Sequence, residues 1–319
     1  MNKLPSGHTP VLLAEVLDVL RPKDGGIYID GTFGAGGYAQ GLLDAVGCRV
    51  WGIDRDPNVI ARADALVRRY EGRLQLVQGR FSEMDRLMQE RGIDGADGVA
   101  LDLGVSSMQL DEPSRGFSFR FDGPLDMRMS SSGPTAAELI ARASEHDLAD
   151  VIFTFGEERR ARPIARAIVA ARAEAPIETT GRLAEIVRRA AGPRARDGID
   201  PATRTFQALR IWVNDELREL ERGLVAAESI LAPGGRLAVV SFHSLEDRTV
   251  KDFLRTRSGA APAASRHMPM PSMEREPSFR LLSRSAIKPS DAEIRSNARA
   301  RSARLRAAER TDASAWREA

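Results

Sequence analysis

The chain has 319 residues, a formal net charge of +2 and one cysteine. This length suits one large or two ordinary domains, and the nearly balanced charge excludes a polycation that binds nucleic acid through its overall charge. The single Cys48 excludes an internal disulfide, and the first residues contain no long apolar run. We therefore expect a cytoplasmic protein with no signal peptide and no membrane contact.

Strands and helices alternate over the first hundred residues. Short apolar runs predict strands at 27–30, 50–54, 74–77 and 98–102. Helical stretches lie between them at 38–46, 57–70 and 82–91. Strands that alternate with helices predict a parallel sheet with right-handed crossovers, in which the ligand lies beyond the carboxyl ends of the strands.

A glycine-rich turn follows the first strand, and a carboxylate ends the second. Glycines at 31, 34, 36 and 37 let the backbone turn tightly and approach a ligand without a Cβ in the way. Asp54 ends the second strand, where a carboxylate can accept hydrogen bonds from both hydroxyls of a ribose. Together the turn and Asp54 indicate a cofactor that carries adenosine.

Two adenosine cofactors fit this segment. Residues 34–39 match the relaxed form of the dinucleotide fingerprint, which indicates NAD. However, Asp30 stands directly before the turn, where it would face a pyrophosphate and repel it. Thr32 and Phe33 also make the turn longer than a pyrophosphate requires. S-adenosylmethionine carries an ammonium and a sulfonium but no phosphate, so the segment favours the methyl donor, with NAD as the alternative.

The alternation stops after Asp102. No strand is predicted from about 108 to 205, and helical patterns occupy 135–153, 156–174, 179–191 and 202–231. A strand returns at 236–241, and a strand-like alternation follows at 302–308. This order predicts an all-helical domain, residues 108–215, inserted between two parts of the sheet domain, residues 1–107 and 216–319. The stretch 258–279, rich in Ala, Pro, Met and Ser, is typical of a mobile loop.

Distinctive motifs follow one another along nearly the whole chain. They occupy residues 8–11, 30–37, 54–57, 101–107, 115–119, 124–129, 156–159, 201–207, 241–248 and 297–302. In these motifs and their order the chain resembles the bacterial 16S ribosomal RNA cytosine-N4 methyltransferases, the family of ribosomal small-subunit methyltransferase H. It departs from the family's pattern at Tyr38, where many relatives have His, and at Met108, where Pro is common.

The resemblance implies an α/β fold of the class I S-adenosylmethionine-dependent methyltransferases, with a Rossmann-like, mostly parallel sheet and the inserted helical domain. It implies methylation of the exocyclic N4 amine of a cytosine in the decoding region of 16S ribosomal RNA, within the small ribosomal subunit. The family's contacts with S-adenosylmethionine correspond here to Gly36, Gly37, Tyr38, Asp54, Phe81, Asp102 and Gln109.

The residues themselves support several of these contacts. Gly36 and Gly37 form the close-approach turn, and Asp54 is the ribose carboxylate. Phe81 follows the third predicted strand, where an aromatic ring can stack on adenine. At Tyr38 the backbone is the expected contact, so the change from His should not abolish activity.

The acceptor chemistry points to two catalytic candidates. A cytosine amine is a poor nucleophile because its lone pair is delocalised into the ring, so catalysis needs an acceptor for the amine hydrogens. Many amino methyltransferases place Asp/Asn/Ser-Pro-Pro-aromatic after the fourth strand, but residues 102–107 take that place here. Asp102 is the first candidate, for contact with either the amine or the donor. His243 is the second, although it could instead only support a helix capping box at Ser244 and Asp247.

Candidates for RNA contact are less specific. Phe117 and Phe119 can stack on a flipped base or anchor their own loop. Arg204, Arg210 and Arg218 lie opposite the apolar stripe of the last predicted helix, and they either contact RNA phosphate or form a solvated face. The same two interpretations hold for the arginines at 299, 301, 304 and 306.

Two other classes of function are alternatives to the RNA methyltransferase. One is an NAD-dependent oxidoreductase, which the glycine fingerprint alone would allow. The other is a ribosome-assembly factor that keeps the fold without catalysis, which the intact glycine turn, Asp54 and Asp102 argue against. The sequence contains no Cys/His cluster, so no metal is expected, and a homodimer remains open.

Overall fold

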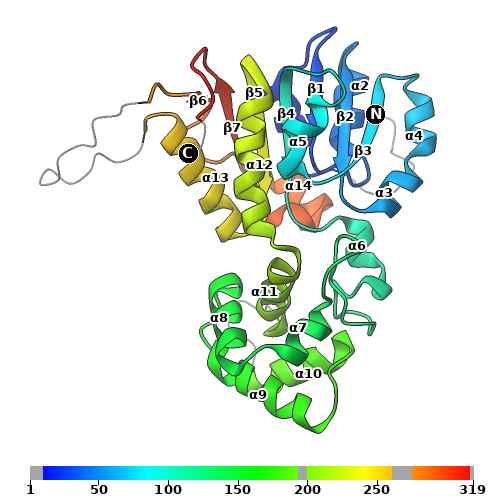
Figure 1. The fold of residues 1–319 in the computed structure, drawn as a ribbon, viewed down its shortest axis with the longest axis vertical. Coiled ribbons are helices and arrows are strands. Elements are labelled where there is room, and N and C mark those ends of the chain that lie inside the picture. The colour runs from blue at the N-terminus through cyan, green and yellow to red at the C-terminus, as the bar shows by residue number, and fades with distance from the viewer. Residues whose placement is uncertain (1–9, 193–199, 261–274, 317–319) are drawn as a thin grey trace, which may run out of the picture. The chain divides into compact units, whose positions relative to one another are not determined.

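The computed structural model describes residues 10–192, 200–260 and 275–316 (Figure 1). It divides into two compact units. The first comprises the described parts of Met1–Gly104 and Leu217–Ala319, and the second comprises those of Val105–Glu216. Most of the loop expected at 258–279 lies outside the described residues.

A seven-stranded sheet with the order β3-β2-β1-β4-β5-β7-β6 is the frame of the first unit. The strands are β1 (Ile27–Asp30), β2 (Arg49–Asp54), β3 (Leu74–Gln78), β4 (Ala96–Asp102), β5 (Leu231–Ser241), β6 (Phe279–Leu281) and β7 (Arg304–Arg310). Strands β1 to β5 pair in parallel, and β7 runs antiparallel to both of its neighbours. This topology confirms the expected α/β fold with a mostly parallel sheet. The short strand β6 was not predicted.

Helices cover both faces of this sheet. They are α1 (Leu13–Leu20), α2 (Gly37–Ala45), α3 (Pro57–Arg62), α4 (Asp64–Arg69), α5 (Met84–Gln89), α12 (Glu216–Ile230), α13 (Ser244–Arg257) and α14 (Asp291–Ser296), with 3-10 turns η1 (Phe81–Glu83) and η3 (Ala298–Ser302). Helices α5, α12 and α13 share an apolar cluster with the strands on one face. Helices α1 and α2 contact the strands on the other face, where Tyr28 and Leu20 fill the space beside Gly98.

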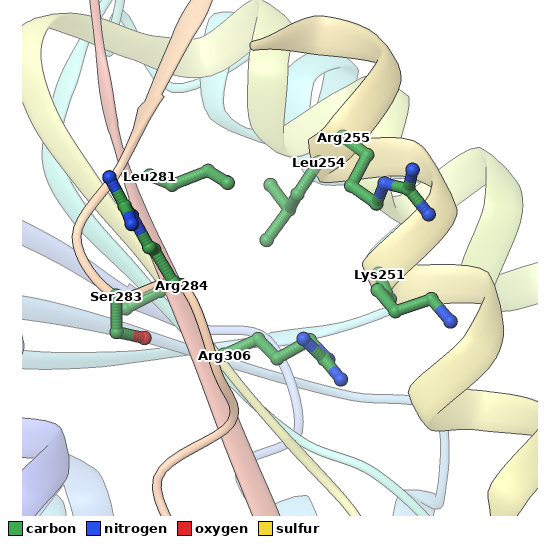
Figure 2. A pocket seen from close by; sticks show the side chains of 8 residues that line it. Lys251, Leu254, Arg255, Leu281, Ser283, Arg284 and Arg306 are labelled. Atoms are coloured by element: carbon green, nitrogen blue, oxygen red, sulfur yellow. The ribbon is translucent and has the colours of Figure 1, made fainter. Parts of the chain in front are cut away.

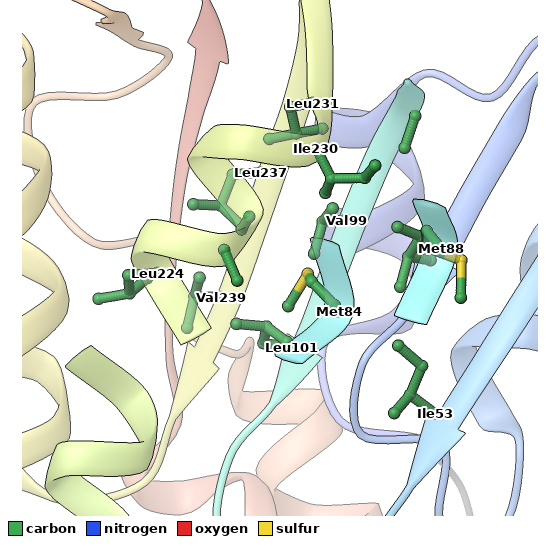
Figure 3. Packing of buried hydrophobic residues seen from close by; sticks show 14 of the residues in the cluster. Ile53, Met84, Met88, Val99, Leu101, Leu224, Ile230, Leu231, Leu237 and Val239 are labelled. Atoms are coloured by element: carbon green, nitrogen blue, oxygen red, sulfur yellow. The ribbon is translucent and has the colours of Figure 1, made fainter. Parts of the chain in front are cut away.

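The apolar cluster shows why α5 and α12 lie where they do. Figure 3 shows Met84 of α5 beside Val99 and Leu101 of β4, with Met88 of α5 on one side of them and Leu224 of α12 on the other. The methionines and Leu101 are fully or almost fully removed from solvent. Burying an apolar side chain of this size contributes about 1.5–3 kcal/mol, so this face fixes α12 against the central strands.

The helix expected at 202–231 is wrong as a single element. It divides into α11 (Ala202–Asn214) and α12, and Asp215 between them has a left-handed φ of 52°. Asp tolerates this conformation better than most residues, so the chain can end one helix and begin the next without glycine. The periodic apolar pattern continues through the break, because each half supplies the core of a different unit.

The break also overturns the expected row of arginines. Arg204 and Arg210 lie on α11 in the second unit, whereas Arg218 lies on α12 in the first. The guanidinium of Arg210 donates from Nε and Nη2 to both carboxylate oxygens of Glu216, each at 2.9 Å. The three arginines therefore do not follow one another along a single helix, as the sequence predicted.

Short helices build the second unit around their own core. They are α6 (Ser107–Asp111), η2 (Pro113–Arg115), α7 (Ala136–Arg142), α8 (Glu145–Gly156), α9 (Ala161–Glu174), α10 (Thr180–Ala191) and α11. Phe117 is buried in this core, and the ring of Phe119 packs edge-on against Phe206 with centroids 4.7 Å apart. Both rings anchor their loop, which favours the second of the two roles considered for them. None of the helices within the described ranges is long and apolar enough to cross a membrane.

Candidate donor-binding site

Three carboxylates end neighbouring parallel strands on the same side of the sheet. Asp30 ends β1, Asp54 ends β2 and Asp102 ends β4, and β1 lies between the other two strands. The residue before each aspartate belongs to the apolar cluster under α5 and α12. Since successive side chains of a strand point to opposite faces, the three carboxylates share the face that carries α2. The alternation of side chains between the two faces of the sheet thus brings these negative charges together at one edge, formed by the carboxyl ends of the strands.

Asp54 holds the glycine turn in place. Its Oδ2 accepts a hydrogen bond from the Gly34 N–H at 2.9 Å, and its Oδ1 accepts one from the Asp56 N–H at 2.9 Å. Burial raises the pKa of Asp54 despite these two bonds. A carboxylate has about four lone-pair sites, so ribose hydroxyls can still donate to it. The predicted contact with ribose is therefore compatible with the role of Asp54 in the turn.

Asp30 is turned toward the protein rather than toward a ligand. It is 1% exposed, and it accepts hydrogen bonds from the Ala39 N–H at 3.1 Å and the Thr32 N–H at 3.4 Å. Burial, opposed by these bonds, raises the pKa of Asp30 to about 7. The expectation that Asp30 would face a ligand directly is therefore wrong, because its carboxylate is occupied by the start of α2.

Asp102 has an unpaired oxygen. Its Oδ1 is buried and has no hydrogen-bond partner among the residues that the structure describes. Its own N–H donates to Thr32 Oγ1 at 2.6 Å, which fixes the end of β4 to the glycine turn. Burial, then the charges of Asp30 and Glu246, raise the pKa of Asp102 well above its ordinary range. A buried hydrogen-bond acceptor without a hydrogen-bond donor is costly. A bound molecule that donates a hydrogen bond to Oδ1 would therefore gain more binding free energy there than at an acceptor that is already paired.

The glycines of the turn serve packing within the protein. Gly36 has a φ of +75°, and a Cβ on it would lie 2.8 Å from carbons of both Phe33 and Leu66. A Cβ on Gly37 would lie 2.3 Å from Pro10 Cγ. The sequence predicted both a tight turn and a close approach to a ligand at these glycines. The positive φ of Gly36 fits the tight turn, and the neighbouring side chains that fill the positions of the missing Cβ atoms give a further reason for glycine here.

The Tyr38 side chain is also committed to the protein. Its ring is 3% exposed, and its hydroxyl donates to the Val11 carbonyl at 2.6 Å. The side chain thereby ties α2 to Val11, two residues before the start of α1. This leaves the backbone of Tyr38 for a ligand, which is compatible with the predicted contact.

Two residues of α12 that sequence reasoning missed fix Phe81. A Cβ on Gly223 would lie 2.2 Å from Phe81 Cε2, so the ring packs directly on the helix backbone. One turn earlier, Glu219 accepts hydrogen bonds from the Ser82 N–H at 3.2 Å and the Ser82 hydroxyl at 2.9 Å. Glu219 also pairs with Arg80 at 3.2 Å and is only 2% exposed. The signal in the sequence was a charged residue placed within an apolar helical stripe.

His243 is the N-cap of α13. Its Nδ1 accepts from the Glu246 N–H at 3.4 Å, and Glu246 Oε2 accepts from the His243 N–H at 3.4 Å. The capping box expected at Ser244 and Asp247 is therefore wrong by one residue, and Asp247 pairs with arginines of β7 instead. His243 Nε2 lies 3.1 Å from Glu246 Oε1, but it has no hydrogen-bond partner in the described part of the chain.

Gln109 belongs to the second unit. Its N–H donates to Ser106 Oγ at 3.3 Å and its Oε1 accepts from the Ser106 N–H at 3.1 Å, which closes the capping box of α6. The six other residues that are predicted to contact S-adenosylmethionine lie in the first unit, at or just beyond the carboxyl ends of β1 to β4.

The chemistry of this edge fits S-adenosylmethionine better than a dinucleotide. Burial raises the pKa of each strand-end aspartate, and a neighbouring cation would offset the cost of ionising them. S-adenosylmethionine brings an ammonium and a sulfonium, whereas a pyrophosphate would add negative charge. The fold and this edge define a class I S-adenosylmethionine-dependent methyltransferase.

Comparison with known proteins identifies the family. The MraW methylase family matches residues 5–311. "Ribosomal RNA small subunit methyltransferase H" of Rhodospirillum centenum is 62% identical over 313 residues, covering 98% of this chain and 95% of that protein. The protein of the same name from Paramagnetospirillum magneticum is 58% identical, covering 98% of each chain. A solved rRNA methylase from Streptococcus thermophilus aligns with a TM-score of 0.36 at 11% identity, over 94% of this chain and 93% of that chain. The chain belongs to the MraW methylase family, which confirms the expected family and methyltransferase activity.

Replacing Gly223 with Ala should weaken donor binding through Phe81. The new Cβ overlaps the ring, so we expect Gly223→Ala to displace Phe81 and reduce the affinity for S-adenosylmethionine about tenfold, measured by calorimetry. A base–aromatic stack is worth about 1–3 kcal/mol. Phe81→Ala in the Gly223→Ala background removes the overlap, so the two substitutions should be non-additive in unfolding free energy. An unchanged affinity in Gly223→Ala and Phe81→Ala would remove Phe81 from the site.

Asp30 should make stability depend on pH. Its pKa is about 7 in the folded chain against an ordinary 3.8, so the folded state holds the proton more tightly and loses this stabilisation as pH rises from about 4 to about 7. The slope for one group is at most about 1.4 kcal/mol per pH unit. We expect Asp30→Asn to gain stability relative to wild type across this window, in denaturant titrations at each pH. The exposed Asp94→Asn should show no such trend, and parallel curves for Asp30→Asn and wild type would contradict the account.

Proposed function

We propose that this methyltransferase transfers a methyl group from S-adenosylmethionine to the exocyclic N4 amine of a cytosine in the decoding region of 16S ribosomal RNA. Membership of the MraW methylase family supports the proposal, as does the name of the relatives that match over 98% of the chain. The single structural observation that carries it is the unpaired, buried Oδ1 of Asp102 at the carboxyl end of β4.

Asp102 has the properties that a cytosine amine requires. When bound, the donor supplies an electrophilic methyl group on a sulfonium. The amine nitrogen becomes nucleophilic only if an acceptor draws on its hydrogens and so localises the lone pair. The ionised Asp102 can accept an N–H at Oδ1, and its raised pKa makes it a stronger acceptor than an ordinary aspartate. We assign it the contact with the amine.

His243 is a weaker candidate for the proton acceptor. Its Nδ1 already accepts the Glu246 N–H of the capping box. A neutral imidazole that accepts at one nitrogen carries its proton on the other, so Nε2 would donate rather than accept. We therefore propose that His243 is a positioning residue that fixes the loop between β5 and α13.

The proposed partner is 16S ribosomal RNA within the small ribosomal subunit, in the cytoplasm. We propose that the second unit, expected from the sequence at 108–215, carries part of the RNA recognition. Two large apolar rings of that unit, Phe121 and Phe153, are 68% and 61% exposed. Exposed aromatic rings can stack on unpaired bases, so both are candidates for RNA contact.

Asp102→Asn should abolish most of the turnover without unfolding the chain. The substitution keeps the shape but removes the charge, and losing a positioned proton acceptor costs about 10²-fold or more in kcat. Mass spectrometry of 16S ribosomal RNA after incubation of unmethylated small subunits with enzyme and donor measures N4-methylcytidine directly. Asp94→Asn, an exposed aspartate just before the other end of the same strand, is the matched control.

The melting temperature separates a catalytic effect from a folding effect. Removing a buried charge should leave the melting temperature of Asp102→Asn at or above that of wild type. Wild-type turnover in Asp102→Asn would show that the carboxylate is not needed. If the wild-type chain binds small subunits but transfers no methyl group, the protein is a non-catalytic assembly factor instead.

A further inference from the structure

A groove in the first unit is strongly cationic. It has a volume of about 290 Å³ and lies between α13, β7 and the segment that follows β6. Figure 2 shows Lys251 and Arg255 on α13 at one side and Arg284 at the other, with Leu254 and Leu281 between them. The remaining lining residues are Ser283, Arg306 and Ala307. Four cations over a partly apolar floor form a concentrated positive field.

Little acidic charge neutralises this groove. Arg306 donates from Nε to Asp247 at 2.7 Å, and Arg304 shares the same carboxylate at 3.0 Å. Although burial raises it, these two arginines hold the pKa of Asp247 below its ordinary value, so it stays ionised. Lys251 and Arg255 make no side-chain ion pair or hydrogen bond with the described residues, and neither does Arg284. Three cations are therefore available to an anionic ligand.

The groove lies along α13 from the donor-binding edge. The helix begins at Ser244, after its N-cap His243 near the carboxyl end of β5, and Lys251 and Arg255 follow on it. At 1.5 Å per residue, they lie about 12 and 18 Å along the helix from the N-cap. A stacked strand advances about 3.4 Å per nucleotide, so this distance corresponds to roughly four or five nucleotides from a base held at the edge.

We propose that this groove binds backbone phosphates of the RNA strand that flanks the methylated cytosine. The inference rests on the proposed function for the identity of the RNA. Arg guanidinium groups match the geometry of phosphate, and a lysine adds a point charge. The groove offers no aromatic ring and no array of amide side chains among its lining residues, so it reads charge rather than base sequence. The base itself is recognised by residues at the carboxyl ends of the β-strands.

The test removes the three available cations and leaves Arg306 with Asp247. We would prepare Lys251→Gln/Arg255→Gln/Arg284→Gln and a charge-conserving Lys251→Arg/Arg255→Lys/Arg284→Lys. A matched control, Arg49→Gln/Arg68→Gln/Arg69→Gln, removes the same charge from exposed positions of β2 and α4. Binding to 16S ribosomal RNA and to small subunits is measured by filter binding across a salt series, and donor affinity by calorimetry.

We expect the groove variant to bind RNA at least about tenfold more weakly, with its log–log salt slope reduced by about 2, at 0.7 for each lost single-strand contact. Donor affinity and melting temperature should stay at wild-type values, and the charge-conserving variant should bind like wild type. The proposal is overturned by an unchanged affinity and slope, by an equal loss in the matched control, or by no binding of either RNA probe to the wild-type chain. Binding to vesicles of anionic lipid is measured in parallel. The proposal is also overturned if the groove variant keeps wild-type binding to RNA and loses only its binding to these vesicles.

Methyl transfer separates this proposal from the proposed function. With the groove variant, the KM for RNA should rise while kcat at saturating RNA is retained. If the wild-type chain binds RNA through the groove but methylates no cytosine, the proposed function fails and the groove stands. If the wild-type chain methylates cytosine and the groove variant has an unchanged KM, the groove proposal alone fails.

Discussion

The gathering of three carboxylates at the carboxyl ends of neighbouring parallel strands is the constraint on which the rest of the structure depends. Asp30, Asp54 and Asp102 lie together there because the strands are parallel and their pairing aligns the ends. Backbone N–H groups of the turn and of α2 satisfy two of the three, and one oxygen of the third is left unpaired. A cationic ligand is the simplest compensation for this charge, and the methyl donor carries two cationic groups.

The sequence predicted the features that follow from periodicity and composition. Five strands, the glycine turn and the strand-end positions of Asp54 and Asp102 are visible as apolar runs that end in polar residues, and a sixth strand, β7, is visible as an alternation of apolar and polar residues. The break at Asp215 and the shift of the cap to His243 were not predictable, because each depends on the φ/ψ of one residue that tertiary packing selects. Glu219 looked like part of an ordinary amphipathic helix, and its role depends on a turn more than a hundred positions away.

Helix α13 connects two proposed sites in the first unit. Its first residues form the cap that holds the loop after β5, and its later turns carry two of the four cations of the groove. Asp247 stands between them and ties the helix to β7 through Arg304 and Arg306. One rigid element thus sets the spacing between the reacting edge and the proposed phosphate contacts. Because α13 is rigid, the cations of the groove can fix the position of the RNA strand while the residues at the carboxyl ends of the β-strands select the base.

The central claim is that Asp54 and Asp102, at the ends of β2 and β4, form part of the donor site, and Asp54 tests it most directly. Calorimetric titration of S-adenosylmethionine and S-adenosylhomocysteine into Asp54→Ala, with Asp54→Asn as a variant that keeps an acceptor for the turn, measures the contribution of this carboxylate. The account predicts that both ligands lose about 1.5–3 kcal/mol of binding in Asp54→Ala, the value of a hydrogen bond to a charged group. Folded variants that bind both ligands with wild-type affinity would contradict it.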